Sequence, residues 1–173
     1  MASLIVSLGL RLRRAVRWSG WMFALVLSCA AAVADEASLL IRGDIADPSG
    51  AVVLDAAALE KLNVVSFETS TIWTEGQMTF SGPTLASVLS LVGAGGGDLL
   101  LQAVNDYEVT FPISMASSDA PIIVTRVNDK PFSIKEKGPL WVVFPYDCGP
   151  EFRTELIYAV SVWQLTQITV LPE

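Results

Sequence analysis

The side chains that most often carry catalysis are scarce in this 173-residue sequence. It contains no histidine, and its two cysteines are Cys29 and Cys148. Ser-His-Asp triads, Cys-His pairs and His-ligated zinc sites are therefore excluded. Acid–base catalysis near neutral pH would need a carboxyl group with a shifted pKa, because no histidine is present to titrate there.

Two short segments carry the remaining chemical candidates. Asp106-Tyr107-Glu108 offers a general base beside a phenol donor, but the same pattern is typical of a solvated turn before a strand, which we favour. Cys148 lies in a Tyr-Asp-Cys-Gly-Pro turn, and we interpret it as incidental. We therefore predict no catalytic residue and no metal ligand.

Arg153 stands between Glu151 and Glu155, close in sequence to Asp147. This spacing favours a structural ion-pair cluster. The alternative is an arginine that holds a carboxylate or oxyanion ligand through two parallel hydrogen bonds.

Four aromatic residues are candidates for a small-molecule pocket, although such residues more often fill a core or its rim. They are Trp73, Tyr107, Tyr146 and Trp163. The predicted ligand-binding residues are Thr69, Thr71, Trp73, Tyr107, Tyr146 and Arg153.

The elements that must position these residues are mostly short strands. Alternation of apolar and polar residues, bounded by Gly, Pro, Asn and Asp, predicts strands over 38–44, 64–71, 99–104, 108–112, 122–127, 140–144 and 168–171. Asp55 is placed to cap a short helix that runs to Leu62. A clearer helix opens at Pro83 and ends at Gly93, with Leu85, Val88, Leu89 and Val92 as its apolar stripe. We predict a single α+β domain, with a mixed, curved β-sheet and a few short helices.

Residues 1–34 have the pattern of a secretory signal peptide, and residues 35–173 form the predicted domain. Four arginines precede an apolar run from Trp18 to Ala32, and Ala32-Val33-Ala34 is a small-x-small cleavage motif. The run is short for a membrane span of about 20 residues, so we expect cleavage and export to a bacterial periplasm. A twin-arginine signal at Arg13-Arg14 and a lipoprotein site at Ser28-Cys29 match less well.

The domain is acidic. After residue 34 it holds seven Lys and Arg and all 18 Asp and Glu, a formal charge of 7 − 18 = −11. This charge argues against nucleic acid and anionic lipid as partners.

Four segments, in order, carry a family resemblance. They are Phe67–Leu91 (F-E-T-S-T-I-W-T-E-G-Q-M-T-F-S-G-P-T-L-A-S-V-L-S-L), Asn105–Pro112, Asn128–Phe132 and Lys137–Pro145. Together they resemble the molybdopterin-binding oxidoreductase domain, which has the sulfite-oxidase-like fold, over about residues 40–171. Phe144–Leu165 is similar to the ending of a short exported subgroup of that family.

The sequence departs from the family where the chemistry takes place. In catalytic members a cysteine thiolate ahead of a comparable segment binds molybdenum, whereas the matching window here holds Thr69, Ser70 and Thr71. A hydroxyl is a harder and far less acidic donor than a thiol, so it does not replace the thiolate. Basic residues that grip the pterin phosphate are also scarce. The resemblance implies molybdopterin as cofactor, but these departures lead us to expect none.

The resulting expectation is an exported, non-catalytic member of this fold. It would bind a small anionic ligand or an envelope protein, and it would keep no stable membrane span after signal cleavage. Two alternatives remain open: a true molybdopterin-dependent oxidoreductase with atypical ligation, and a structural partner subunit of an envelope complex.

Overall fold

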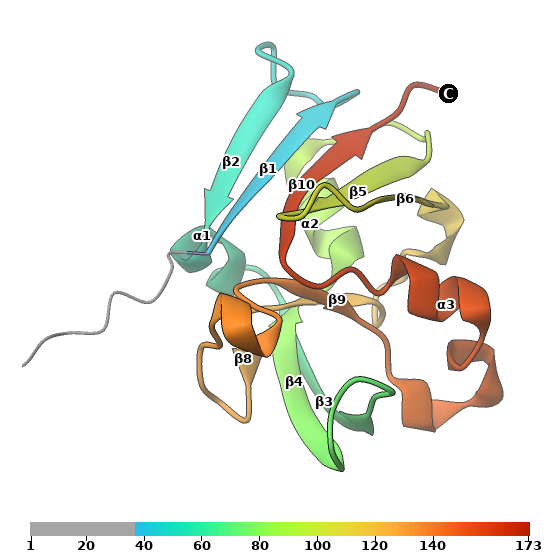
Figure 1. Ribbon diagram of the computed structural model, residues 1–173. Helices are drawn as coiled ribbons and strands as arrows, with labels where there is room; N and C mark the ends of the chain where they lie inside the picture. Colours follow the sequence, from blue (N-terminus) through green and yellow to red (C-terminus); the bar gives the residue numbers. More distant parts are fainter. Residues whose placement is uncertain (1–36) are drawn as a thin grey trace, which may run out of the picture. The chain divides into compact units, whose positions relative to one another are not determined.

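The computed structural model describes residues 37–173, which form one small α+β domain with three α-helices and several sheets (Figure 1). The expected signal peptide lies outside the described residues. Within 37–173, no helix is long and apolar enough to cross a membrane. The predicted α+β class is confirmed, but the strands form three sheets where one curved sheet was predicted.

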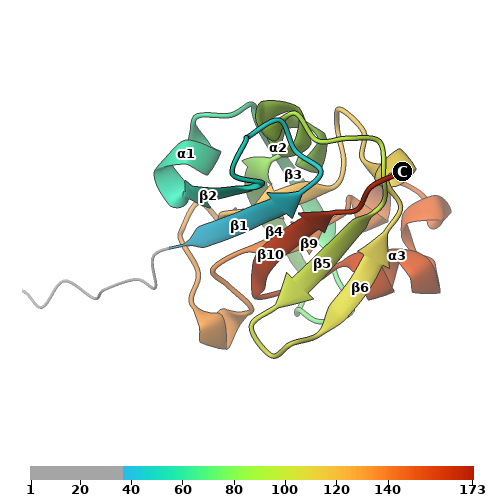
Figure 2. The same cartoon turned by 90° about the horizontal axis from the view of Figure 1, so that it is seen from above.

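The largest sheet has five strands in the order β2-β1-β10-β5-β6. Its strands are β1 (Ser38–Gly43), β2 (Ala51–Asp55), β5 (Leu99–Ala103), β6 (Glu108–Phe111) and β10 (Leu165–Val170). The first and last of these in the chain, β1 and β10, pair in parallel, and the other neighbours are antiparallel. The sheet is therefore mixed, as predicted, and Figure 2 shows its five strands side by side.

The second sheet, β3-β4-β8, consists of β3 (Val64–Ser70), β4 (Gln77–Pro83) and β8 (Arg126–Val127). The third pairs β7 (Ile122–Val124) with β9 (Trp141–Val143). Prolines at 121, 139 and 145 flank β7 and β9, and proline cannot donate a backbone hydrogen bond to a ladder. The strands stay at three residues, and only isolated bridges join the third sheet to its neighbours.

Strand β4 and strand β7 approach each other closely at Gly82. A Cβ atom built at this position would lie 2.0 Å from the carbonyl oxygen of Ile123, which real contacts do not allow. Glycine is therefore required there. The predicted strand 122–127 is divided in the structure, because Thr125 turns to donate its N–H to Ser81 and Arg126 then pairs with β4.

Local capping interactions explain where the helices begin and end. Asp55 caps α1 (Ala56–Glu60) through a 2.7 Å bond from the Ala58 N–H, as predicted, but the helix ends at Glu60 and not at Leu62. Helix α2 (Leu85–Val92) is capped by Thr84, so Pro83 is the last residue of β4 and not the first of the helix, which corrects the prediction. Gly93 ends α2 in the left-handed region at φ 59°, as expected. The sequence did not predict α3 (Glu155–Val160), which Thr154 caps.

The core joins the large sheet, α2 and the short third sheet. The predicted α2 stripe of Leu85, Val88, Leu89 and Val92 is buried. Aromatic side chains concentrate toward β9 and α3, where Trp141, Phe144 and Tyr146 are almost fully buried. Four single 3₁₀ turns complete the domain: η1 (Ile113–Met115), η2 (Ile134–Glu136), η3 (Tyr146–Cys148) and η4 (Pro150–Phe152).

Candidate functional site

Trp73 lies at the centre of the candidate site. It is half-buried in the loop Thr71–Gly76 that joins β3 to β4. The Thr71 hydroxyl holds this loop, since it accepts the Trp73 N–H at 3.0 Å and shares a 2.8 Å hydrogen bond with the Thr74 hydroxyl. The side chain of Thr71 therefore positions Trp73.

The Trp73 ring makes edge-to-face contacts with four other aromatic rings. The centroid distances are 5.5 Å to Trp163, 5.7 Å to Tyr158, 5.8 Å to Trp141 and 6.3 Å to Tyr146. Each such pair stabilises by about 0.5–1.5 kcal/mol beyond its area burial. The indole is therefore held in one orientation.

Two pockets share Trp73 as a lining residue. The smaller, which we call the aromatic pocket, has a volume of about 220 Å³. It is lined by Trp73, Ala103, Asn105, Tyr107, Tyr158, Ala159, Ser161, Val162 and Trp163. None of these described lining residues is a carboxylate, thiol, amine or guanidinium, so the pocket offers apolar surface, an amide and hydroxyls.

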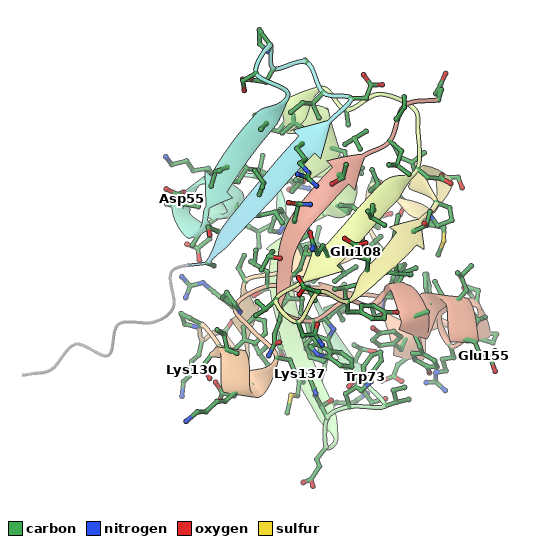
Figure 3. All side chains as sticks on the ribbon, turned by 45° about the horizontal axis from the view of Figure 1, so that its top comes forward. Asp55, Trp73, Glu108, Lys130, Lys137 and Glu155 are labelled. Atoms are coloured by element: carbon green, nitrogen blue, oxygen red, sulfur yellow. The ribbon has the colours of Figure 1, made fainter. Side chains whose placement is uncertain are left out.

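The larger, which we call the lysine pocket, has a volume of about 700 Å³. It is lined by Trp73, Thr74, Glu75, Met78, Phe80, Val127, Asn128, Lys130, Pro131, Phe132, Lys135, Glu136, Lys137 and Trp141. Figure 3 shows Lys130, Lys137 and Trp73 along this side of the domain, whereas Glu155 projects from α3. The sequence analysis did not propose the three lysines.

The predicted aromatic residues divide between lining and support. Trp73, Tyr107 and Trp163 line the aromatic pocket. The ring of Tyr107 is 45 % exposed, and its hydroxyl donates to the Ala159 carbonyl at 3.2 Å. Tyr146 is only 1 % exposed and lies behind the pocket, where its hydroxyl donates to Ser161 Oγ at 2.7 Å. Burial raises the pKa of Tyr146 well above the ordinary phenol value, so this phenol stays protonated.

Two further predicted residues, Thr69 and Arg153, contact Asp147. With Ser70 and Gln77 they form what we call the Asp147 cluster: Thr69, Ser70, Gln77, Asp147 and Arg153. The Asp147 carboxylate accepts the Ser70 N–H at 2.6 Å and the Ser70 hydroxyl at 2.8 Å. Arg153 donates to the same carboxylate and to the Tyr146 carbonyl. The bonds from Ser70, with smaller contributions from Gln77 and Arg153, hold the pKa of Asp147 well below its usual range.

Arg153 and Thr69 therefore have structural partners. The guanidinium pairs with Asp147, which was one of the acidic neighbours considered, and it lines neither pocket. Thr69 is 0 % exposed, and its hydroxyl accepts the Asp147 N–H at 3.1 Å. The structure thus brings Thr69 and Arg153 together through Asp147, apart from the pocket linings.

Residues 69–71, which resemble the position of a molybdenum ligand, are not suited to binding molybdenum. The Thr69 hydroxyl is buried and hydrogen-bonded, and the Thr71 hydroxyl holds the Trp73 loop. Cys148 is exposed on η3 and lines neither pocket. Residues 37–173 also contain no group of three or more His, Cys, Asp or Glu that could hold a metal ion. Residues 69–71, where the resemblance would place a thiolate, therefore offer hydroxyl groups and no soft donor.

Comparison with known proteins adds no identity, since no family model and no curated protein matches the chain.

Proposed function

We propose that this chain is an exported, non-catalytic member of the molybdopterin-binding oxidoreductase fold that binds a small ligand at Trp73. The ordered motifs between residues 67 and 145 support the family, and the α+β domain with a mixed sheet agrees with it at the level of fold class. The signal-like residues 1–34 support export to the bacterial periplasm.

The observation that carries the binding proposal is the aromatic pocket. Its volume of about 220 Å³ exceeds the roughly 150 Å³ of an apolar cavity that binds benzene. Its rings are fixed before any ligand arrives, since Trp73 contacts Tyr158 and Trp163 edge to face. A rigid aromatic wall lowers the entropy cost of binding. The pocket therefore suits a flat compound of one or two rings.

The same lining supports a non-catalytic role. A catalytic site needs a nucleophile, or an acid and base, placed against the reacting atoms. The residues that line the aromatic pocket include no charged side chain, and the Ser161 hydroxyl already donates to the Ile157 carbonyl at 2.7 Å. What remains is shape, apolar surface and a few hydrogen-bonding groups, which is sufficient for recognition.

A titration with indole, followed by NMR, tests this proposal. The Trp73 and Trp163 indole N–H signals and the amides of Asn105 and Tyr107 should shift together and saturate. Trp73→Ala should abolish the shifts. Ile72→Ala is the matched control, because Ile72 is an exposed apolar residue of the same loop that lines neither pocket.

Shifts confined to residues outside the aromatic pocket, or full binding by Trp73→Ala, would overturn the proposal. If indole causes no NMR shifts and the protein binds a specific envelope protein, the alternative of a structural partner subunit would be favoured. Redox turnover with stoichiometric molybdenum would favour the oxidoreductase alternative.

A further inference from the structure

The lysine pocket collects a large share of the positive charge of an acidic domain. Residues 37–173 contain seven Lys and Arg against 16 Asp and Glu. Three of the four lysines, Lys130, Lys135 and Lys137, line this one pocket, and Lys61 is the fourth. Such a concentration raises the local potential for anions in a protein that repels them elsewhere.

These lysines have no carboxylate partner within the described residues. The two ion pairs recorded over 37–173 are Arg126–Glu60 and Arg153–Asp147. Glu75 and Glu136 also line this pocket, and neither forms an ion pair with these lysines among the described residues. One carboxylate oxygen of Glu136 accepts the Ser133 N–H at 3.0 Å and the Ser133 hydroxyl at 2.9 Å. These bonds lower the pKa of Glu136 and hold its charge at the start of η2. The lysine ammonium groups therefore stay available to a ligand.

The backbone fixes where the lysines stand. Lys130 closes a two-residue hairpin turn whose central residues, Asn128 and Asp129, have φ of 50° and 63°, and Val127 exchanges two hydrogen bonds with Lys130. Lys137 ends η2 in the left-handed region at φ 76°, and its carbonyl accepts the Gln164 N–H at 3.0 Å. Both lysines thus project from defined turns.

Lys137 lines the lysine pocket and contacts a ring of the aromatic pocket. Its side chain is half-buried, and its Nζ lies 4.8 Å from the centroid of the Trp163 ring. This cation–π contact places the ammonium against a ring that lines the aromatic pocket, while Lys137 itself lines the lysine pocket. Trp73 lines both. A ring held at Trp73 and Trp163 would therefore have a positive charge next to it.

We propose that the ligand is an aromatic anion: its ring lies against Trp73 and Trp163, and its carboxylate or similar acidic group points to Lys137, with Lys135 and Lys130 as the outer charges. This inference rests on the proposed ligand-binding function and names the ligand class. The sequence analysis considered an anion at Arg153 only as an alternative to an ion pair, and in the structure Arg153 pairs with Asp147.

The test compares two probes of equal shape and different charge. Binding of 2-naphthoate and the neutral 2-naphthamide is measured at low salt through the Trp73 and Trp163 indole N–H signals. The carboxylate should bind about tenfold more tightly, because a charge-assisted contact is stronger than a neutral one. Added salt should reduce this preference.

Lysine-to-glutamine variants show which lysine supplies the positive charge next to the ligand. Lys137→Gln should remove most of the tenfold preference, and the matched control Lys61→Gln, at a lysine outside both pockets, should leave it intact. If Lys137→Gln disturbs the amide spectrum of the loop, the double variant Lys130→Gln/Lys135→Gln, which should weaken the preference, takes its place.

Equal affinity for both probes, with binding lost in Trp73→Ala, would overturn the anion inference and leave the ligand-binding proposal intact. A preference for naphthoate that persists unchanged in all the lysine variants would also overturn the inference. Failure of both probes to bind would contradict both proposals.

Discussion

The two sides of the β3–β4 loop differ in how their polar groups are used. In the Asp147 cluster, Thr69, Ser70 and Arg153 all hydrogen-bond with Asp147, either with its carboxylate or with its backbone N–H. At Trp73, a few residues further along the chain, the side chains line two open pockets, and the nearby lysines have no carboxylate partner within 37–173. The polar groups of the Asp147 cluster are therefore used in hydrogen bonds within the fold, whereas the neighbouring pockets leave side chains available to a ligand.

Trp73→Ala should have the largest effect, because it removes a ring that contacts four others. We expect loss of indole and naphthoate binding, with a fall of about 2–3 kcal/mol in the free energy of unfolding, since the ring is half-buried. Urea denaturation and the NMR titration measure the two effects. Trp73→Phe should recover much of both, and unaffected binding by Trp73→Ala would contradict a role for the pocket.

Asp147→Asn should show that the Asp147 cluster affects stability and that the two pockets affect binding. The variant weakens the charge-assisted bonds from Ser70 and Arg153, so the free energy of unfolding should fall. Affinity for 2-naphthoate should not change, because Asp147 lines neither pocket. A folded Asp147→Asn protein that has lost binding would show that the cluster belongs to the ligand site.

The lowered pKa of Asp147 predicts that the protein becomes less stable in acid. The pKa of Asp147 in the fold lies below its unfolded value of about 3.9, so its contribution is present above that pH and is lost as the pH falls toward the folded value. Asp47 and Glu136, whose pKa values are also lowered by hydrogen bonds, act in the same direction. Urea unfolding between about pH 7 and pH 3 should show declining stability, with a shallower decline in Asp147→Asn. Identical slopes in the two proteins would contradict this assignment.

Tyr107→Phe should have the smallest effect. The phenol donates one bond to the Ala159 carbonyl from a partly exposed ring, so its loss should cost about 0.5 kcal/mol of stability. The ring itself remains in the aromatic pocket, and the affinity for indole should stay within about twofold of the parent. A large loss of binding would indicate that the hydroxyl contacts the ligand directly.

Local patterns predicted much of this fold because their causes are local. The apolar stripe of α2, the left-handed end at Gly93 and the Asp55 cap depend on residues within a few positions of each other. The division into three sheets did not follow from such patterns, because it depends on which strands meet in space. Strand β4 was not predicted, and Pro83 at its end was assigned to the start of the following helix. Gly82 lies in the strand, where a side chain would clash with the Ile123 carbonyl.

The candidate site was predicted only in part, because some of its residues come together only in the folded chain. Trp73, Tyr107 and Trp163 were proposed as pocket residues and line one. The lysines were missed because their convergence depends on the hairpin at Asn128-Asp129 and on the end of η2. One signal was present: Lys130, Lys135 and Lys137 fall within eight residues of a chain that has few other lysines.

The molybdenum and pterin content of the protein, purified after export in a bacterium that makes the cofactor, tests the central claim most directly. The account predicts no stoichiometric molybdenum and no pterin fluorescence, because the Thr69 and Thr71 hydroxyls are occupied and no thiolate lines either pocket in the described domain. One molybdenum per chain, with pterin released on denaturation, would contradict it.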